Sequence, residues 1–391
     1  MLYNNDTAKL LGLEDVIVKN VYEDNDAQHI EIELPRKVHV CPCCGWETDR
    51  IHDYRVQKVK DLDAFGMPAV LHLRKRRYLC DSCGKRFYEE NPFLPRYYRR
   101  TSRVIAHIIH TFRRSVSASH IAEENGISIT TALRYFDLVE YSACELPEVL
   151  SMDEFKGDAG GEKYQTILTD AKGRQILDIL PNRKEADLIR YFCRFKNKRA
   201  VKYVVIDMNK HFRDVAKTCF PRATIVIDRY HVTRQVIWAM ERVRKAVQKS
   251  LSPEWRKHFK RSRYLLNKSP SKMTEEEHEK VRTILSYSAR LERAYHLKNE
   301  FLLIMHSSSS EDAKEDLSDW IYRAEKSSLP EFRECTKAFH NWSAYILNAF
   351  DVPYTNGFTE GCNNKTKVLK RACYGVRNFS RFRNRILHSA T

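Results

Sequence analysis

The 391-residue chain lacks any apolar run long enough to cross a membrane, and its first residues lack the basic and apolar segments of a secretory signal. Internal repeats are absent, which excludes solenoids. Glycine is absent between residues 174 and 356, and acidic residues are absent from residue 361 to the end. We therefore expect a soluble intracellular protein with a long helical stretch and a basic C-terminal segment.

Positive charge is concentrated in two segments. The chain has 68 Lys and Arg against 51 Asp and Glu, a net charge of +17. Residues 74–114 carry +9 and residues 361–391 carry +8, so the remainder is neutral. Two concentrated basic segments favour two contacts with nucleic acid over general solubility charge. The alternative is that both are merely solvated basic faces.

Five of the 11 cysteines precede residue 84, and four of them form two matched C-x-x-C-G motifs. These pairs are Cys41 with Cys44 and Cys80 with Cys83, separated by 35 residues. Glycine after each pair lets the backbone curl so that its amides point at sulfur. Four thiolates predict a closed structural zinc site, and an intracellular chain disfavours disulfides. Cys43 is an extra thiol that could replace Cys41 or Cys44.

Residues 1–95 are predicted to form a zinc ribbon. The segment between the knuckles alternates apolar and polar residues in VQKVKDLDAF and PAVLHLRKRRYLC, which predicts short strands. Basic and aromatic residues interleave in the last strand and after the second knuckle, which is typical of a phosphate-contacting surface. The candidate phosphate contacts are Arg74, Arg76, Arg99 and Arg100.

Residues 96–145 are predicted to form a helix-turn-helix. Ser117 or Ser119 can cap a short helix, Asn125 and Gly126 supply a tight turn, and Ser128 can cap a second helix. The apolar positions of that second helix are Ala132, Leu133, Phe136, Leu138 and Val139. Its residues predicted to face the major groove are Ser128, Thr130, Thr131 and Arg134. The alternative is an ordinary helical hairpin.

Residues 146–250 show the pattern β-β-β-α-β-α-β-α, which predicts a mixed sheet with helices on its faces. Three predicted strands end in Asp153, Asp207 and Asp228. The carboxyl ends of parallel strands meet at one crevice, and gathered carboxylates favour Mg²⁺ or Mn²⁺. Two such ions suit phosphodiester chemistry. For any single Asp, the alternative is a cap on the following helix.

Residues 351–391 are predicted to complete the catalytic core, and within them the segment from residue 354 to residue 371 carries a single acid among basic residues. Glu360 lies near the start of the amphipathic segment TEGCNNKTKVLKR. The polar and basic residues that follow it are Asn363, Asn364, Lys365, Lys367, Lys370 and Arg371. This mixture suits an active-site helix that lies along DNA. The alternative is a basic surface helix with one compensating Glu.

Several motifs together resemble the ISL3 family of insertion-sequence transposases over nearly the whole chain. They are the two cysteine knuckles, MDEF, VIDMNKHFRDVAKTCFPRATIVIDRYHV and NGFTEGCNNKTKVLKRACYGVRNFSRFRNRIL. The resemblance implies a ribonuclease H-like DDE domain in which Asp153, Asp207 and Glu360 hold the metal ions. It also implies an accessory D-x-x-H element formed by Asp228 and His231.

The 152 residues between Asp207 and Glu360 exceed what one strand and one helix need, so an insertion is implied. Residues 251–350 are rich in helix formers, and we expect an all-helical insert. Its tryptophans, Trp255, Trp320 and Trp342, are expected in the core. The predicted fold is thus multidomain α+β, with a zinc ribbon, a helix-turn-helix and a ribonuclease H-like α/β core interrupted by helices.

The expected activity is metal-dependent hydrolysis at transposon ends, followed by attack of the freed 3′-hydroxyl on target DNA. The implied partners are double-stranded DNA, as terminal inverted repeats and target, and further copies of the chain in a dimer or larger assembly. The implied location is the bacterial cytoplasm, at the nucleoid. Two alternatives stay open: a DNA-binding regulator without catalysis, and a nuclease that does not join strands.

Overall fold

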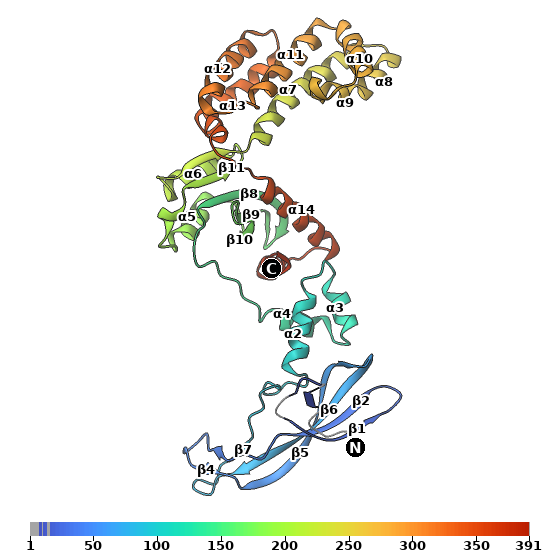
Figure 1. Cartoon of the computed structure of the whole chain (residues 1–391), viewed down its shortest axis with the longest axis vertical. Coiled ribbons are helices and arrows are strands. Elements are labelled where there is room, and N and C mark those ends of the chain that lie inside the picture. Colours follow the sequence, from blue (N-terminus) through green and yellow to red (C-terminus); the bar gives the residue numbers. More distant parts are fainter. Residues whose placement is uncertain (1–7, 10, 14–15, 391) are drawn as a thin grey trace. The chain divides into compact units, whose positions relative to one another are not determined.

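The computed structural model describes residues 8–390 except residues 10, 14 and 15. The chain divides into two compact units, Met1–Val139 and Glu140–Thr391. Figure 1 shows the first in blue to cyan and the second in green to red. Within the described residues, no helix is both long enough and apolar enough to span a bilayer.

The first unit is built on a five-stranded sheet in the order β1-β2-β6-β5, with β7 also paired to β6. The strands are β1 (Ile17–Glu23), β2 (Gln28–Glu33), β5 (Ile51–Ala64), β6 (Met67–Leu79) and β7 (Arg86–Tyr88). Alternate residues of β2 and β6 point to one side, where Ile30, Ile32, Leu71 and Leu73 pack in a shared core with Val59.

Strands do form between the knuckles, but the prediction that they are short is wrong. β5 has 14 residues and β6 has 13, and β2, which precedes the first knuckle, pairs in parallel with β6. A two-stranded pair, β3 (His39–Val40) with β4 (Glu47–Thr48), frames the first knuckle. Alternation indicates a strand but carries no information on which distant strand pairs with it.

Three helices complete the first unit: α2 (Ser102–Thr111), α3 (Ala118–Glu124) and α4 (Ile129–Phe136). The side chain of Ser117 caps α3 and that of Ser128 caps α4, which confirms two expected capping residues. Gly126 takes a φ of +57° in the turn between the two helices, a conformation that favours glycine. The rings of Phe112 and Phe136 stack with centroids 4.4 Å apart.

One predicted core position of α4 is wrong. Leu138 is 60% exposed, whereas Tyr135 is buried. The helix ends at Phe136, so Leu138 lies beyond the last helical turn and no longer follows its apolar stripe.

The second unit contains a five-stranded sheet in the order β10-β9-β8-β11-β12. Its strands are β8 (Val149–Ala159), β9 (Glu162–Asp170), β10 (Gln175–Leu180), β11 (Tyr203–Ile206) and β12 (Thr224–Ile227). β8, β11 and β12 are parallel, whereas β9 and β10 are antiparallel to their neighbours. The connecting helices are α5 (Glu185–Cys193), η1 (Lys198–Ala200), α6 (Lys210–Cys219) and α7 (Arg229–Lys249). The predicted order of strands and helices is confirmed.

The described residues between α7 and residue 350 form helices and contain no strand, which confirms the helical insert. The elements are α8 (Pro253–Arg261), α9 (Arg263–Asn267), η2 (Pro270–Lys272), α10 (Glu275–Ser286), α11 (Ala289–Ile304), α12 (Ser310–Lys326), α13 (Pro330–Leu347) and η3 (Asn348–Phe350). Trp320 and Trp342 are buried as expected. Trp255 is 40% exposed, so its prediction as core is wrong: it lies on the short helix α8, with its ring against Tyr287.

Two C-terminal helices return to the sheet, α14 (Gly357–Ala372) and α15 (Phe379–Ala390). Figure 1 shows α14 beside β8 and β9, which it contacts, while α15 contacts β10. Cys362 and Leu369 of α14 and Phe382 of α15 share a core with Phe155 of β8. A segment that begins 198 residues after the end of β8 therefore covers the same sheet.

Candidate metal centres and nucleic-acid surfaces

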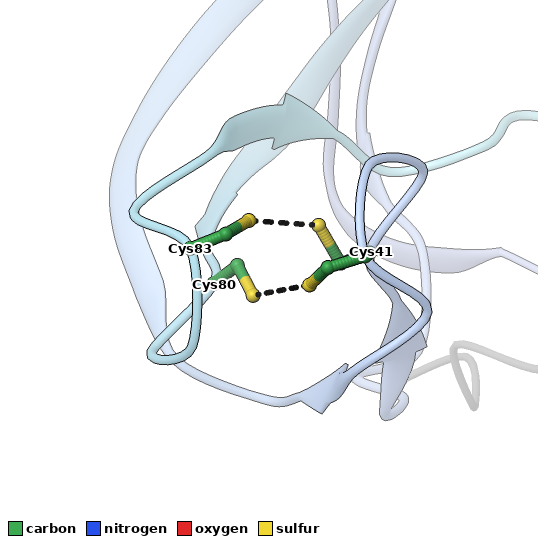
Figure 2. A group of neighbouring side chains, drawn as sticks. Cys41, Cys80 and Cys83 are labelled. Atoms are coloured by element: carbon green, nitrogen blue, oxygen red, sulfur yellow. Dashed lines mark hydrogen bonds between the residues drawn. The ribbon is translucent and has the colours of Figure 1, made fainter.

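The four knuckle cysteines converge in the first unit. One sulfur from each of Cys41, Cys44, Cys80 and Cys83 lies within 4.8 Å of the others. The sulfurs of Cys41 and Cys83 lie 3.6 Å apart, and those of Cys44 and Cys80 lie 3.5 Å apart. Figure 2 shows Cys80 and Cys83 of the second loop facing Cys41 of the first. Sulfurs about 2.3 Å from a zinc ion lie roughly 3.8 Å apart at the corners of a tetrahedron. The set therefore fits a structural zinc ion.

The two loops have the same local geometry. The N–H of Gly45 donates to the carbonyl of Cys41, and that of Gly84 donates to the carbonyl of Cys80, both at 3.0 Å. Burial alone raises the pKa of the Cys41 thiol, but the N–H groups of Cys44 and Cys43 and the neighbouring sulfurs lower it to about 6. A thiolate at this position is suited to bind metal.

Cys43 does not belong to this set. It is exposed, and the four sulfurs that lie together are those of the other knuckle cysteines. Cys43 contributes its backbone N–H to the sulfur of Cys41 at 3.5 Å. The ambiguity that the motif CPCCG leaves open is thus resolved by geometry.

Strand register brings three aspartates to one level of the second sheet. Met152 of β8 pairs with Ile206 of β11, and Ile206 pairs with Ile227 of β12. Asp153, Asp207 and Asp228 each follow one of these paired residues. Asp207 and Asp228 end their strands as predicted. Asp153 does not, because β8 continues to Ala159 along its antiparallel partner β9.

Asp153 is buried and held at both oxygens. The N–H of Glu154 donates to Oδ1, and Nδ2 of Asn363 on α14 donates to Oδ2, both at 2.8 Å. Burial is the main cause that raises the pKa of Asp153, and the charges of Asp207 and Glu360 add to it, whereas the Glu154 N–H and His231 oppose it; the net pKa is about 6. These three carboxyl groups therefore share one electrostatic environment.

Asp207 has an unsatisfied oxygen. Its Oδ1 is buried without a hydrogen-bond partner among the described residues. Burial also raises the pKa of this carboxyl, although His231 acts in the opposite direction. An orphaned carboxylate oxygen beside other acids is a position that a cation would satisfy.

Asp228, His231 and Glu360 form the second cluster of metal-ligand type, with one ligand atom of each within 4.8 Å of the others. Nε2 of His231 lies 3.0 Å from Oε1 of Glu360, and Nδ1 lies 3.2 Å from a guanidinium nitrogen of Arg234. Asp228 caps α7 through the N–H of Tyr230. Glu360 thus faces the same side of the sheet as the aspartates.

Uncharged side chains that sequence reasoning missed fix α14 against β8. Ser151 donates to Oδ1 of Asn356 at 2.5 Å, and Thr359 donates to Ser151 at 3.1 Å. The N–H of Asn356 donates to Oδ2 of Asp228 at 3.1 Å, and the hydroxyls of Thr359 and Thr169 lie 2.8 Å apart. Common polar residues in no recognisable spacing carry no signal of this network in the sequence.

The predicted DNA contacts near the knuckles divide into accessible and inaccessible residues. Arg74 and Arg99 are exposed and Arg100 is half-buried. Arg76 is 5% exposed, and its guanidinium binds Glu33, Glu89 and the carbonyl of Leu34. Arg76 therefore neutralises buried acids, and its prediction as a DNA contact is wrong.

The polar face of α4 is accessible. Ser128, Thr130 and Arg134 are exposed, and Thr131 is half-buried. Ser128 and Thr131 are partly engaged in the cap, since the Thr131 N–H donates to the Ser128 hydroxyl at 3.2 Å. Arg134 lies over the ring of Tyr135 and projects from the last turn of the helix.

The predicted DNA contacts on the basic helix α14 also fall into exposed and buried residues. The exposed predicted contacts are Asn364, Lys365, Lys367 and Arg371, and Lys370 is half-buried against Asp158 at 2.5 Å. Asn363 is buried and donates to Asp153, so its prediction as a DNA contact is wrong. It belongs instead to the carboxylate site.

Comparisons with known proteins cover both units. A family model described as a transposase, of the ISL3 DDE type, matches residues 150–386. A second model, described as the zinc-finger of transposase IS204/IS1001/IS1096/IS1165, matches residues 37–83. The first match spans the second sheet, the helical insert and α14.

Individual relatives agree with these models. The chain is 27% identical to the transposase for insertion sequence element IS1001 of Bordetella parapertussis, over 89% of this chain and 88% of that protein. It is 26% identical to the transposase for IS1557 of Mycobacterium tuberculosis, over 55% and 54%. A Lactococcus lactis protein named ATP-dependent protease is 33% identical over 27% of this chain, a share too short to bear on function.

Proposed function

Because the chain belongs to the ISL3 family of insertion-sequence transposases, we propose that Asp153, Asp207 and Glu360 form its catalytic centre for strand cleavage and strand transfer. The observation that carries this proposal is how the fold places the three carboxyl groups: strand register sets Asp153 and Asp207 at one level of the sheet, and Asn363 of α14, the helix that carries Glu360, donates to Asp153 at 2.8 Å. The three groups come from β8, β11 and α14, and the charges of Asp207 and Glu360 both act on Asp153. Asp153 is buried and Asp207 and Glu360 are half-buried, and a bound cation would compensate the repulsion that His231 and the hydrogen bonds to Asp153 offset only in part.

The residues present fit Mg²⁺ or Mn²⁺. The donor set consists of hard carboxylate oxygens, including the orphaned Oδ1 of Asp207. Ions bound there would activate a water or 3′-hydroxyl and stabilise the leaving oxygen of a phosphodiester. Asp153, Asp207 and Glu360 would hold them.

The surrounding residues orient this set. Asn363 and the N–H of Glu154 each occupy one oxygen of Asp153, which fixes the plane of the carboxylate. His231 holds Glu360 in the first turn of α14. Asp228 caps α7 and binds the N–H of Asn356, so it joins the helix that carries His231 to the start of the helix that carries Glu360. We assign Asp228 and His231 as positioning residues.

The finer fold assignments rest on topology. Three antiparallel strands followed by two parallel ones, with α14 against β8 and β9, support a ribonuclease H-like core. Two capped helices joined at Gly126, with an accessible polar face on the second, support a helix-turn-helix. We propose that α4 reads the terminal inverted repeats and that α14 contacts phosphates near the cleaved bond.

Two other functions fit less well. A DNA-binding regulator would have no need to bury acids beside a surface that binds a polyanion, and here Asp153 and Asp207 both carry raised pKa values. A nuclease without strand joining would use the same centre. Joined DNA products distinguish it from a transposase.

The test is cleavage and joining of DNA that carries the element's ends, in Mg²⁺. Asp153→Asn, Asp207→Asn and Glu360→Gln should each lower cleavage at least about a thousandfold, while end binding is unchanged or slightly tighter because a charge that repels phosphate is lost. Calorimetry with Mn²⁺ should show weaker ion binding in each variant. The matched control is Asp316→Asn, an exposed acid on the insert.

The Asp228→Asn variant distinguishes the proposed catalytic set from the cluster that Asp228 forms with His231 and Glu360. As a positioning residue it should retain Mn²⁺ binding and lose only part of the activity. Undiminished cleavage after Asp153→Asn, together with loss of ion binding after Asp228→Asn, would move the metal site to Asp228, His231 and Glu360.

A further inference from the structure

A groove runs along α7 where α8 and α9 pack against it. It consists of two adjoining hollows of about 220 and 530 Å³, both lined by Arg263 and Asn267. The first is also lined by α7, and the second by the end of α8 and the start of α9. We call this feature the α7 groove, and it is not part of the carboxylate site.

Exposed aromatic rings and a cation alternate on the α7 side. Tyr230, Arg234 and Trp238 follow one another at four-residue spacing and therefore share a face of the helix. Tyr230 is 58% exposed and Trp238 is 50% exposed. The Arg234 guanidinium carbon lies 5.7 Å from the centre of the Tyr230 ring and 4.9 Å from that of Trp238. Exposed indole and phenol rings with a cation between them form a surface on which a flat, anionic ligand can stack.

The opposite wall is basic. Lys260, Arg261 and Arg263 are exposed there, together with the ring of Tyr264. Among the described residues that line the groove, Glu241 supplies the acidic charge, and two hydrogen bonds of 2.7 Å from Arg244 compensate it. The groove is therefore positively charged and suits an anionic ligand with flat apolar surfaces.

The groove begins beside the carboxylate site. Arg234 contacts His231, which contacts Glu360, whereas Nε of Arg234 is buried without a partner among the described residues. Trp238 follows His231 by seven residues, about 10 Å along the helix axis. That distance is on the order of two or three nucleotides of an extended strand.

We propose that the α7 groove binds an unpaired DNA strand, with a nucleobase stacked on Trp238 and phosphates held by Arg234 and Arg263. Stacked rings with interleaved cations are the chemistry that recognises single strands without regard to sequence. A paired base cannot offer its face to Trp238, because its neighbours in the duplex already cover it. The position of this strand next to the cleaved bond rests on the proposed function. The affinity of the groove for an unpaired strand does not.

The first test measures binding of the full chain to a fluorescent oligothymidylate of about 12 nucleotides and to a blunt duplex of equal length. Trp238→Ala should weaken single-strand binding about tenfold and leave duplex binding unchanged. Tyr322→Ala is the matched control, since Tyr322 is an equally exposed ring on α12 of the same insert, with the Lys326 amine 5.7 Å from its centre. It should change neither affinity.

The second test detects stacking directly. 2-Aminopurine placed in the single strand should lose fluorescence on binding the unmodified chain, keep it with Trp238→Ala, and lose it again with Trp238→Phe. A circular dichroism melt of each variant establishes that the insert is folded. Rescue by Phe distinguishes a stacking surface from a residue that only supports α7.

Three outcomes would overturn the proposal. If Trp238→Ala and Tyr322→Ala change the oligothymidylate affinity equally, the groove does not bind the strand. Equal weakening of single strand and duplex by Trp238→Ala would assign it to paired DNA. If Trp238→Ala abolishes binding of a polyglutamate peptide but leaves oligothymidylate binding intact, the groove binds an acidic protein segment instead.

The catalytic proposal is tested by different variants. Asp153→Asn should abolish cleavage without changing oligothymidylate affinity. If Asp153→Asn keeps full cleavage while Trp238→Ala still loses the single strand, the proposed function fails and the groove assignment survives. If Asp153→Asn abolishes cleavage while Trp238→Ala binds the strand normally, the opposite holds.

Discussion

The zinc centre and the carboxylate site bring charged ligands together in opposite ways. Each pair of zinc ligands belongs to one short loop, and the two loops have the same turn geometry. The carboxylates come from two strands and a helix, and Asp153 and Glu360 are 207 residues apart. Local spacing therefore specifies the first site, whereas strand register and the docking of α14 specify the second.

The two sites also differ in what holds them before any ion binds. At the zinc centre the sulfur contacts are accompanied by a hydrogen bond from the Thr48 hydroxyl to the Leu79 carbonyl at 2.8 Å and by an exposed ion pair between Arg50 and Asp81. By contrast, Ser151, Asn356 and Thr359 tie α14 to β8 through buried hydrogen bonds. We therefore expect zinc to stabilise the fold around the knuckles, and ions in the second unit to bind a framework that is already built.

The largest expected effect is loss of zinc. Purified protein should contain close to one zinc ion per chain, and replacement of Cys80 and Cys83 by Ser should abolish binding worth on the order of 10 kcal/mol. Metal analysis measures the ion, and amide hydrogen exchange should show lost protection around the knuckles.

Two results would break the comparison at this point. Cys43→Ser is the control and should keep its zinc, because Cys43 lies outside the sulfur cluster. A zinc-free protein whose knuckles stay protected would show that the ion is not part of the fold. A chelator that lowers the melting temperature of the second unit would show that its framework does depend on an ion.

A smaller effect concerns Lys298, a buried charge that neither kind of site explains. It lies on α11, fully buried, with its amine 3.4 Å from the carbonyl of Lys268. Burial lowers its pKa from 10.5 to about 8. Since each pKa unit corresponds to about 1.4 kcal/mol, Lys298→Met should stabilise the insert by about 3 kcal/mol at pH 7, less whatever the chain recovers by relaxing.

The pH dependence has a defined sign. Between pH 8 and pH 10.5 the folded Lys298 loses its proton before the unfolded one does, so the unmodified chain gains stability as pH rises through this window. The advantage of Lys298→Met should shrink over the same range, as measured by chemical unfolding. A constant advantage would mean that burial does not lower the pKa of the Lys298 amine, which would then stay charged across this window.

The smallest effects distinguish α4 from the basic helix α14. Arg134→Ala on α4 should reduce the preference for terminal repeats over random DNA by about 1 to 3 kcal/mol. Lys367→Ala on α14 should weaken both DNAs similarly and make the salt dependence shallower by about one unit. Titrations at several salt concentrations measure both. Equal loss on both DNAs after Arg134→Ala would remove it from base recognition.

Much of the local structure could be predicted from sequence. Caps at Ser117 and Ser128 and the order of elements in the second unit follow from short-range patterns. The parallel pairing of β2 with β6 could not be predicted, because strand pairing depends on distant residues. Trp255 was misplaced because its residue type predicts burial, whereas the shortness and outer position of α8 leave it exposed.

The sequence predicts the acidic residues of the carboxylate site but not the side chains that hold them in place. Asp153, Asp207 and Glu360 stand in recognisable motifs, but Asn356 and Thr359 are common residues whose role appears only when α14 meets β8. The roles of individual basic residues could not be predicted from the sequence. Charge in the sequence does not distinguish Arg76, which is buried between acids, from Arg74, which is exposed.

The return of the chain from the insert has a consequence for how this architecture tolerates change. Asn348 of η3 donates to the Ile225 carbonyl of β12 at 2.8 Å, and Nε of Arg229 donates to the Ala349 carbonyl at 2.9 Å. The insert thus leaves through α7 and comes back to the strand and helix from which it departed. These two hydrogen bonds anchor both ends of the insert. Helices between them can be added, shortened or exchanged without changing the position of α14 on the sheet. A single residue added within β11 would instead turn Asp207 to the other face of the sheet.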